Sequence, residues 1–387
     1  MRICIVNPFY DDVPASALEV TGRYRHVESL ASALARRQHE VVVVQAFHRD
    51  SVEHRNSAEF RYVRTPYRSV ARLNGGVLGL DLLMAGNLKG LVDAVTDARP
   101  DAVHMNGLTL IQPLSRIGAW CAKTGRPFTV TYHGGIPRPE PWLLQTQRRM
   151  LARCHGAFFT TPTHAQAWTA AGLLKTEQVI PCMEVSSTFS PAGRTQARAR
   201  TGMKGDPVFA WNARLHPIKD PLTALKGFSA IRKSRPDARL YMIYYTSEMQ
   251  TQVLEAIASD PSLGDAVEMR GTIPPQAVED FLNSSDFLIQ SSLREVAGYS
   301  VLEAMSCGVI PVVTDIPSFR AMTDGGRLGV LFPIGDHRVL ADRALAIDRA
   351  NVEDLSSKVR DFFERALSYD SIARTYETVF AQASSRA

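Results

Sequence analysis

Several kinds of sequence signal are scarce or missing in this chain of 387 residues. Its five cysteines are scattered without a close pair, which gives neither a disulfide framework nor the ligand spacing of a zinc site. The longest apolar stretch, residues 77–95, is broken by Asp81, Asn87 and Lys89, and the apolar run at the start is too short for a signal peptide. We therefore expect a cytoplasmic protein with no segment that spans a membrane.

A strong charge of one sign is also missing. Charged residues make up 21% of the chain, and residues 1–195 carry 22 Lys and Arg against 15 Asp and Glu, whereas residues 196–387 carry 22 against 24. This basic surplus in the first half is too dilute for a nucleic-acid surface, but it suits an anionic substrate or an anionic bilayer. The apolar content of 45% and the lack of a repeat exclude disordered and solenoid classes, leaving two or three globular domains.

Short apolar runs alternate with amphipathic segments, which is typical of parallel sheets covered by helices, the α/β class. Strands are predicted at residues 2–6, 40–45, 102–104, 128–132, 157–160, 178–180, 208–211, 239–243, 267–269, 287–290 and 310–313. Helices are predicted at residues 24–37, 80–95, 110–124, 222–233 and 276–284. The pattern predicts two Rossmann-like domains that face each other across a cleft at the carboxyl ends of their strands, where open α/β sheets bind ligands.

The division of the chain follows from a polar segment rich in Pro, Gly and small residues within residues 186–206, which is typical of a linker. We predict a first domain at 1–190, a linker at 191–206 and a second domain at 207–368. Residues 369–387 are predicted as a C-terminal helix, with a return to the first domain as one alternative.

A first candidate motif, WNARLHPIKD, places Arg214 and Lys219 just after the opening strand of the second domain. An arginine fork and a lysine ammonium there could clamp a diphosphate, while the alternative is a pair of solvated loop charges.

A second candidate motif, SLREVAGYSVLEAMSCG, places Glu295 and Glu303 eight positions apart across a strand–loop–helix junction. The loop runs through Ala297 and Gly298 into a helix start at Ser300, whose exposed amides could hold a phosphate. A carboxylate one turn inside that helix could accept hydrogen bonds from a ribose diol. The alternative is a capping residue and an exposed helix charge, but the apolar VLEAM context favours a buried glutamate, which needs a partner.

These two motifs, in this order and spacing, resemble the arginine–lysine pair and the paired glutamates of retaining glycosyltransferases of family 4. The resemblance covers essentially the whole chain, with further similar segments at ARPDAVHMNG, VTYHGG, VEMRGTIP, PVVTDIPSFR and YDSIARTYETVF. It implies a GT-B fold, a first domain that binds the acceptor and a second domain that binds a nucleotide-diphosphate sugar. The implied reaction moves a sugar from a UDP- or GDP-sugar to an acceptor hydroxyl of unknown identity.

The resemblance also implies roles for single residues. His133, followed by Gly134 and Gly135, matches the family's active-site histidine beside the transferred sugar, although a lone histidine at a strand end is otherwise a structural group. His104 matches no role and is predicted in the core or at its rim. The implied catalytic residues are His133, Glu295, Arg214 and Lys219. The implied donor-binding residues are Gly22 in a loop before the first helix, Arg214, Lys219, Thr272, Ala297, Gly298, Tyr299, Ser300 and Glu303.

Three segments depart from the family pattern. Tyr244–Tyr245–Thr246 stands where a glycine pair is usual, VIPCMEVSSTF lacks the usual asparagine–glycine at the hinge, and Val296 and Ala297 replace a more common glycine and aromatic residue. Base contacts, hinge geometry and the choice of sugar therefore stay open.

We expect no metal and no other cofactor. The only adjacent aspartates near a strand end, Asp11 and Asp12, lie in an unsupported loop, and cations with amide donors can stabilise a departing diphosphate instead. Two other classes stay open: a sugar-nucleotide epimerase on the same scaffold and a non-catalytic sugar-nucleotide-binding protein. An NAD-dependent dehydrogenase is disfavoured because no G-x-G-x-x-G follows either opening strand.

The basic segment at residues 142–153, WLLQTQRRMLAR, has two interpretations. It could lie on an anionic bilayer, giving a peripheral membrane contact, or hold an anionic acceptor near His133. The alternative is a helix packed on the first domain with a solvated basic face.

Overall fold

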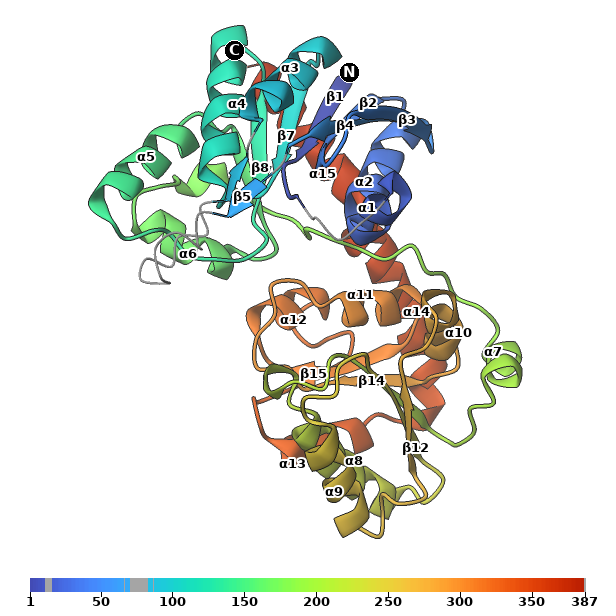
Figure 1. Cartoon of the computed structure of the whole chain (residues 1–387). Helices are drawn as coiled ribbons and strands as arrows, with labels where there is room; N and C mark the ends of the chain where they lie inside the picture. Colours follow the sequence, from blue (N-terminus) through green and yellow to red (C-terminus); the bar gives the residue numbers. More distant parts are fainter. Residues whose placement is uncertain (11–15, 66, 70–82, 86, 386–387) are drawn as a thin grey trace. The chain divides into compact units, whose positions relative to one another are not determined.

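A computed structural model describes residues 1–10, 16–65, 67–69, 83–85 and 87–385 of the chain (Figure 1). The chain divides into two compact units. Unit 1 comprises Met1–Val185 together with Tyr369–Ala387, and unit 2 comprises Ser186–Ser368. Each unit is an α/β sandwich, so the predicted fold class is confirmed.

The sheet of unit 1 has the strand order β10-β9-β8-β7-β1-β2-β4-β3. Its strands are β1 (Arg2–Asn7), β2 (Glu40–Phe47), β3 (Ser51–Arg55), β4 (Ala58–Arg64), β7 (Ala102–Asn106), β8 (Phe128–Thr131), β9 (Gly156–Phe159) and β10 (Val179–Pro181). Runs such as VVVV in β2 are buried because helices cover both faces of a parallel sheet. All pairs in this sheet are parallel except β3 with β4. The predicted strands are confirmed, and the β3–β4 hairpin is an addition.

The helices of unit 1 are α1 (Ala17–Arg23), α2 (Arg25–Arg36), α3 (Leu88–Ala98), α4 (Ile111–Thr124), α5 (Pro141–Leu151), α6 (Pro162–Ala170) and α15 (Tyr369–Ser384). The helix predicted at 80–95 is α3, but it begins only at Leu88 because Asn87 caps it by accepting a hydrogen bond from the Gly90 amide at 2.8 Å. The prediction is wrong at 83–85, where β6 (Leu83–Ala85) pairs with β5 (Tyr67–Ser69). Residues 80–82 and 86 of the predicted helix lie outside the described residues. The Asp11–Asp12 pair lies outside them as well.

The C-terminal helix α15 belongs to unit 1, beside α2 (Figure 1). Its Tyr376 hydroxyl lies 3.1 Å from Nε2 of His104, a fully buried residue of β7, and 3.2 Å from the Thr131 hydroxyl of β8. At the surface, Glu377 of α15 accepts two hydrogen bonds from Arg37 at 2.6 and 2.7 Å. His104 is thus a core residue that joins the last helix to the sheet.

Unit 2 contains a fully parallel sheet of strand order β13-β12-β11-β14-β15-β16. Its strands are β11 (Val208–Asn212), β12 (Arg239–Ile243), β13 (Val267–Gly271), β14 (Phe287–Gln290), β15 (Ile310–Thr314) and β16 (Val330–Phe332). The covering helices are α8 (Pro221–Ser234), α9 (Gln250–Ser259), α10 (Pro275–Asn283), α11 (Tyr299–Ser306), α12 (Pro317–Met322), α13 (His337–Leu345) and α14 (Val352–Phe362). The predicted strands and helices of this half are confirmed.

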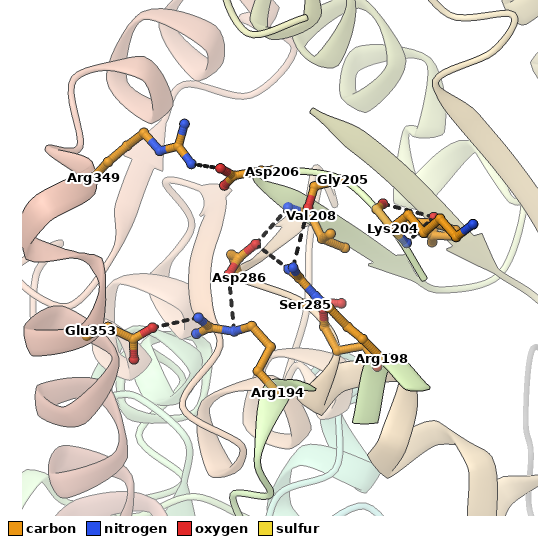
Figure 2. A network of polar contacts seen from close by, with 12 residues as sticks. Arg194, Arg198, Lys204, Gly205, Asp206, Val208, Ser285, Asp286, Arg349 and Glu353 are labelled. Carbon is orange, nitrogen blue, oxygen red and sulfur yellow. Dashed lines mark hydrogen bonds and ion pairs between the residues drawn. The ribbon is translucent and has the colours of Figure 1, made fainter. Parts of the chain in front are cut away.

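The segment predicted as a linker contains a helix, α7 (Arg194–Thr201), that is part of unit 2. Figure 2 shows Arg194 and Arg198 converging on Asp286, at 3.1 and 2.9 Å, beside the start of the central strands. Asp286 also accepts a hydrogen bond from the Val208 amide at 2.7 Å. The polar composition of this segment favoured a free linker. The sequence alone does not show that both arginines pair with the buried Asp286, because Asp286 lies far away along the chain.

Each sheet reverses its strand order at one point. In unit 1, β1 lies between β2 and β7, and in unit 2, β11 lies between β12 and β14. At such a point the loops leave neighbouring strands toward opposite faces, which opens a crevice at the carboxyl ends of the strands. The candidate site residues are therefore expected at the ends of β1 and β7 and at the ends of β11 and β14.

Candidate functional site

In unit 2, the structure brings together Lys219 and Glu295, which the sequence separates by 76 positions. Lys219 ends a short 3-10 turn after β11, and Glu295 lies in the loop that follows β14. The Lys219 ammonium forms an ion pair with Oε1 of Glu295, and their side chains are only 16% and 13% exposed. Ser292 donates a second hydrogen bond to the same carboxylate oxygen at 2.8 Å. The carboxylate is therefore held in one orientation beside the ammonium.

Arg214 lies in the same loop as Lys219 and is half-buried. Within the described part of the chain, its guanidinium makes no ion pair with a carboxylate. Its donors are therefore available to an anion from outside the protein, and the fork geometry of a guanidinium matches phosphate oxygens.

The loop after β14 leads into α11, whose first residue is Tyr299, one residue earlier than predicted. Ser300 donates a hydrogen bond to the Asn212 carbonyl at the end of β11, at 2.5 Å, and this contact fixes the helix start beside the Arg214 loop. Gly298 precedes the helix, where a Cβ atom would lie 2.4 Å from the ring of Phe319. The first amides of a helix have no intrahelical acceptor, so this end of α11 offers donors to an anion.

Glu303 lies one turn inside α11 and is 7% exposed, as expected from its apolar neighbours. Val296 and Ala297 are half-buried in the loop between Glu295 and Gly298. The predicted donor-binding residues from Ala297 to Glu303 therefore form one continuous loop and helix beside the end of β11.

Thr272 lies apart from this group, at the carboxyl end of β13, which β12 separates from β11. Its hydroxyl donates a hydrogen bond to the Tyr244 carbonyl at 3.1 Å, and the Tyr244 amide donates to the Gly271 carbonyl at 2.8 Å. The neighbouring Tyr245 is 69% exposed. The unusual tyrosine pair and Thr272 thus lie together at the carboxyl ends of β12 and β13, apart from the loops that hold Lys219 and Glu295.

In unit 1, His133 follows β8 and is the centre of a group of polar side chains. Its Nδ1 atom lies 2.5 Å from Oε2 of Glu184, whose side chain is 8% exposed. Its Nε2 atom lies 3.3 Å from Oδ1 of Asn106 at the end of β7. The amide nitrogen of Asn106 lies 3.4 Å from Nε2 of His26, and the rings of His26 and His133 are 5.6 Å apart.

Sequence reasoning missed Glu184, Asn106 and His26. Asn106 had a usable signal, since it is a polar residue at the carboxyl end of a predicted central strand. The sequence signal for Glu184 was weaker, namely its position in the segment that departs from the family pattern. Burial, together with the nearby His133 and Arg25, lowers the pKa of His26 to about 3, and burial lowers the pKa of His104 to about 3 as well. Both rings are therefore neutral at neutral pH.

The glycines after His133 adopt backbone conformations that other residues rarely take, with φ of 109° at Gly134 and 96° at Gly135. The Tyr132 hydroxyl donates a hydrogen bond to the Gly135 carbonyl at 2.9 Å and holds this turn. Gly22 differs from its prediction, because it lies inside α1 and not in a loop. Nothing lies within 4 Å of where its Cβ would be, so packing within unit 1 does not require glycine there.

The basic segment at 142–153 forms α5 and uses most of its apolar residues inside unit 1. Leu143, Met150 and Leu151 are buried, so the interpretation as a packed helix describes this face. Trp142 is 62% exposed, and Arg149, seven positions along the same helix face, is also exposed. In the part of the chain that the structure covers, no helix is long and apolar enough to cross a membrane.

Family comparisons agree with this arrangement. Residues 20–182 match the family described as Glycosyltransferase Family 4, and residues 193–365 match the one described as Glycosyl transferases group 1. The chain belongs to glycosyltransferase family 4. The two matches cover most of unit 1 and most of unit 2, so both halves of the chain carry the family's sequence pattern.

Similar proteins extend the comparison. A D-inositol 3-phosphate glycosyltransferase of Paenarthrobacter aurescens (strain TC1) is 25% identical over 201 residues, which are 50% of this chain and 49% of that protein. The chain thus spans about half the length of this curated relative. The solved sucrose-phosphate synthase of Thermosynechococcus elongatus has a TM-score of 0.67 at 16% identity, covering all of both chains. Anabaena HepE, solved with UDP and glucose, has a TM-score of 0.66 at 15% identity and covers 99% of this chain and 100% of its own. These likenesses show that this family 4 chain has the GT-B fold.

Proposed function

We propose that this family 4 protein is a retaining glycosyltransferase that moves a hexosyl group from a nucleoside-diphosphate sugar to an acceptor hydroxyl. The observation that carries the proposal is the group at the switch point of unit 2. There a half-buried Arg214 without an ion-pair partner in the described chain and the Lys219 ammonium lie in one loop, and Ser300 fixes the start of α11 beside that loop. This arrangement concentrates donors for an anion at the ligand-binding edge of the sheet.

The proposed transfer of a sugar requires cations and amide donors beside the diphosphate. When the bond between the sugar and the diphosphate breaks, negative charge develops on the leaving diphosphate and positive charge on the sugar. Preorganised cations and amides stabilise the first charge without reorganising during the reaction. In the proposal, Arg214, Lys219 and the first amides of α11 hold the diphosphate, and no metal ion is needed. The described residues contain no group of three or more His, Cys, Asp and Glu side chains that could hold a metal.

The ion pair between Lys219 and Glu295 gives the lysine a second role. Before the donor binds, the carboxylate compensates the half-buried ammonium, which would otherwise be costly to leave unpaired. An arriving diphosphate offers Lys219 a second anion, and Glu295 is then able to accept a hydrogen bond from a sugar hydroxyl. Glu303, buried in α11, accepts from the ribose hydroxyls.

Unit 1 supplies the histidine and the acceptor-binding loops. His133 contacts the transferred sugar, and the left-handed turn at Gly134 and Gly135 allows the backbone to approach it closely. Acceptor recognition falls to the loops at the carboxyl edge of this sheet, where polar groups such as Asn106 are available. The relative named above acts on an inositol phosphate according to its name, which makes phosphorylated polyols a sensible first acceptor set.

A finer part of the proposal is a peripheral membrane contact through α5. The exposed Trp142 and the exposed Arg149 would meet the headgroup region of an anionic bilayer, while the buried leucines hold the helix on unit 1. The contact would bring the protein to a lipid-linked acceptor.

A panel of UDP-, GDP- and ADP-sugars in a thermal-shift assay tests the donor class, because a ligand at 100 times its Kd stabilises by about 2.7 kcal/mol. The stabilising donor is then incubated with phosphorylated polyols, and the product is examined by NMR for its anomeric configuration. Acceptor-dependent product with retained configuration supports the proposal. Release of the nucleotide with sugar rearrangement in the absence of acceptor would favour an epimerase, and binding without turnover would favour a sugar-nucleotide-binding protein.

A further inference from the structure

The contact between Glu184 and His133 places a carboxylate directly behind the ring that the proposed reaction uses. Oε2 of Glu184 lies 2.5 Å from Nδ1 of His133, and the carboxylate side chain is 8% exposed. The contact is an ion pair and not a hydrogen bond of standard geometry, since Oε2 has no hydrogen-bond partner among the described residues. An ionised carboxylate can only accept hydrogen bonds, so a small rotation of the ring with the hydrogen on Nδ1 would satisfy this oxygen. A carboxylate removed from water in this way needs such a donor, because burying it unpaired is costly.

The second ring nitrogen of His133 faces a different kind of partner. Nε2 lies 3.3 Å from the side-chain oxygen of Asn106, and the nitrogen of that amide lies 3.4 Å from Nε2 of His26. The amide can be turned either way, so it accepts from a protonated Nε2 or donates to a bare one. His26 is neutral above about pH 3 and can serve as the acceptor or the donor on its side.

Two proton arrangements therefore satisfy this group, and they differ in the hydrogen at Nε2 of His133, in the orientation of Asn106 and in which ring nitrogen of His26 carries its hydrogen. In both arrangements Nδ1 is the ring atom that faces the carboxylate of Glu184. The carboxylate thus fixes one end of the ring, while the other end can hold or release a proton without losing a partner.

We infer that Glu184 is a positioning residue that holds the Nδ1–H form of His133 and thereby presents Nε2 to the ligand. The inference rests on the proposed function for its catalytic meaning, but the contact can be tested without any turnover. Glu184 lies in VIPCMEVSSTF, the segment that lacks the asparagine–glycine usual in the family, so this contact belongs to a part of the chain that departs from the family pattern. A histidine oriented by a carboxylate is a recurrent arrangement, because the partner selects the tautomer and the ring orientation.

The first experiment reads the tautomer directly in the full chain. Two-bond 1H–15N correlation spectra of histidine-labelled protein are recorded above pH 8, and the His133 signals are assigned by their loss in His133→Asn. We expect the Nδ1–H tautomer in the wild type and a mixture or the Nε2–H tautomer in Glu184→Gln, because an amide can accept from or donate to Nδ1. A wild-type ring in the Nε2–H form, or an unchanged spectrum in Glu184→Gln, would overturn the inference.

The second experiment measures kinetics with the donor found above. Glu184→Gln keeps the side-chain volume and is expected to lower kcat by about 10- to 100-fold with donor KM changed less than about threefold, by analogy with the loss of carboxylate partners behind metal-ligating histidines. The matched control Glu177→Gln, in an exposed glutamate of the same unit, should stay within about twofold. If Glu184→Gln fails to fold, Glu184→Asp, which keeps the charge, takes its place and should retain the wild-type tautomer.

A double variant separates positioning from an independent role. In a His133→Asn background, Glu184→Gln should lower kcat by less than about threefold, because its partner is already gone. A full 10- to 100-fold loss in that background would show that Glu184 acts without His133. If no donor gives turnover with the wild type, the proposed function fails, and the spectra still decide whether Glu184 selects the tautomer.

Discussion

The two switch points are built from different kinds of side chain. In unit 2, the carboxyl edge near β11 carries full charges: Lys219 paired with Glu295, and Arg214 half-buried without an ion-pair partner in the described chain. In unit 1, the described residues at the corresponding edge near β7 include imidazoles and an amide, with the carboxylate of Glu184 behind His133. The same crevice of a parallel sheet is thus used for charge in one unit and for directed hydrogen bonds in the other.

Under the proposed function, this difference assigns a separate contribution to each unit. Charges at a half-buried edge stabilise a multiply charged group such as a diphosphate, and their effect is large because the local dielectric is low. Neutral imidazole and amide groups instead fix the direction of hydrogen bonds, which suits sugar and acceptor hydroxyls. The comparison predicts that charge removal matters most in unit 2 and that proton placement matters most in unit 1.

The largest expected effect follows from removing a cation of unit 2. Arg214→Ala or Lys219→Ala should each lower kcat/KM by about 100-fold, corresponding to about 3 kcal/mol of transition-state stabilisation. The thermal midpoint should change little in Arg214→Ala but fall in Lys219→Ala, which leaves the Glu295 carboxylate unpaired. Steady-state kinetics measure the loss. Lys226→Ala, in an exposed lysine of α8, is the control and should be silent. Activities within a few-fold of the wild type for both variants would remove the charge-based role of unit 2.

The two glutamates of unit 2 should separate in a binding experiment. Glu303→Gln loses a charge-assisted contact to the ribose and should weaken binding of the free nucleoside diphosphate by about 1.5–3 kcal/mol. Glu295→Gln should not weaken it, because it releases Lys219 for the ligand, yet it should lower turnover. Calorimetry of the diphosphate measures both, with Glu255→Gln on the exposed face of α9 as the control. Equal losses of affinity in the two variants would contradict the division of roles.

Acid should weaken unit 1 through its buried imidazoles. The pKa of His104 is about 3 in the folded chain against 6.5 for a free ring, so the unfolded state binds more protons between these values. Stability is complete above pH 6.5 and falls as the pH drops toward 3, by roughly 1.4 kcal/mol per pH unit for this one ring. Hydrogen exchange at pH 7 and 5, corrected for intrinsic rates, should show a larger loss of protection in β7 than in β11. An equal loss in both strands would contradict the assignment.

A smaller effect is expected at the surface of α5. Trp142→Ala should weaken sedimentation with phosphatidylserine vesicles by about fivefold at low salt, since an exposed indole is lost from the headgroup region. Tyr245→Ala, which removes an exposed aromatic ring from unit 2, is the control. No vesicle binding by the wild type at low salt would end the proposal of a membrane contact.

The smallest effect is expected from chelation. If the cations of unit 2 carry the diphosphate charge, EDTA should change kcat by less than about twofold. Initial rates before and after dialysis against EDTA measure this. Complete loss that Mg²⁺ or Mn²⁺ restores would show that a metal shares the work of Arg214 and Lys219.

The strands of both sheets were predictable because buried parallel strands are continuous apolar runs, such as residues 41–44 and 310–313. The β3–β4 hairpin was not, since its residues are half polar and its turn depends on left-handed Asn56 and Ser57, with φ of 47° and 65°. Helix α7 was missed for another reason: its arginines look solvated until Asp286 is placed beside them.

In the candidate site, too, single residues were predictable from the sequence, whereas contacts between distant segments were not. Arg214, Lys219, Glu295 and Glu303 could be named from spacing and from family resemblance, because the first three follow predictable strand ends and Glu303 lies in the helix that comes next. The ion pair of Lys219 with Glu295, and the contact of Glu184 with His133, join segments 76 and 51 residues apart and depend on how the sheet places its loops. The position of Gly22 was likewise not predictable, because α1 extends through that residue and leaves no loop there.

The place of α15 has a consequence for biosynthesis. Unit 2 is inserted in the chain of unit 1, because Tyr369–Ala387 returns to the sheet that begins with β1. A ribosome therefore completes all of unit 2 before it releases the helix that supplies Tyr376 to His104. During translation, unit 1 therefore lacks α15 on its sheet while unit 2 is synthesised and folds. Although its first residues are made first, unit 1 is the second of the two units to complete its fold.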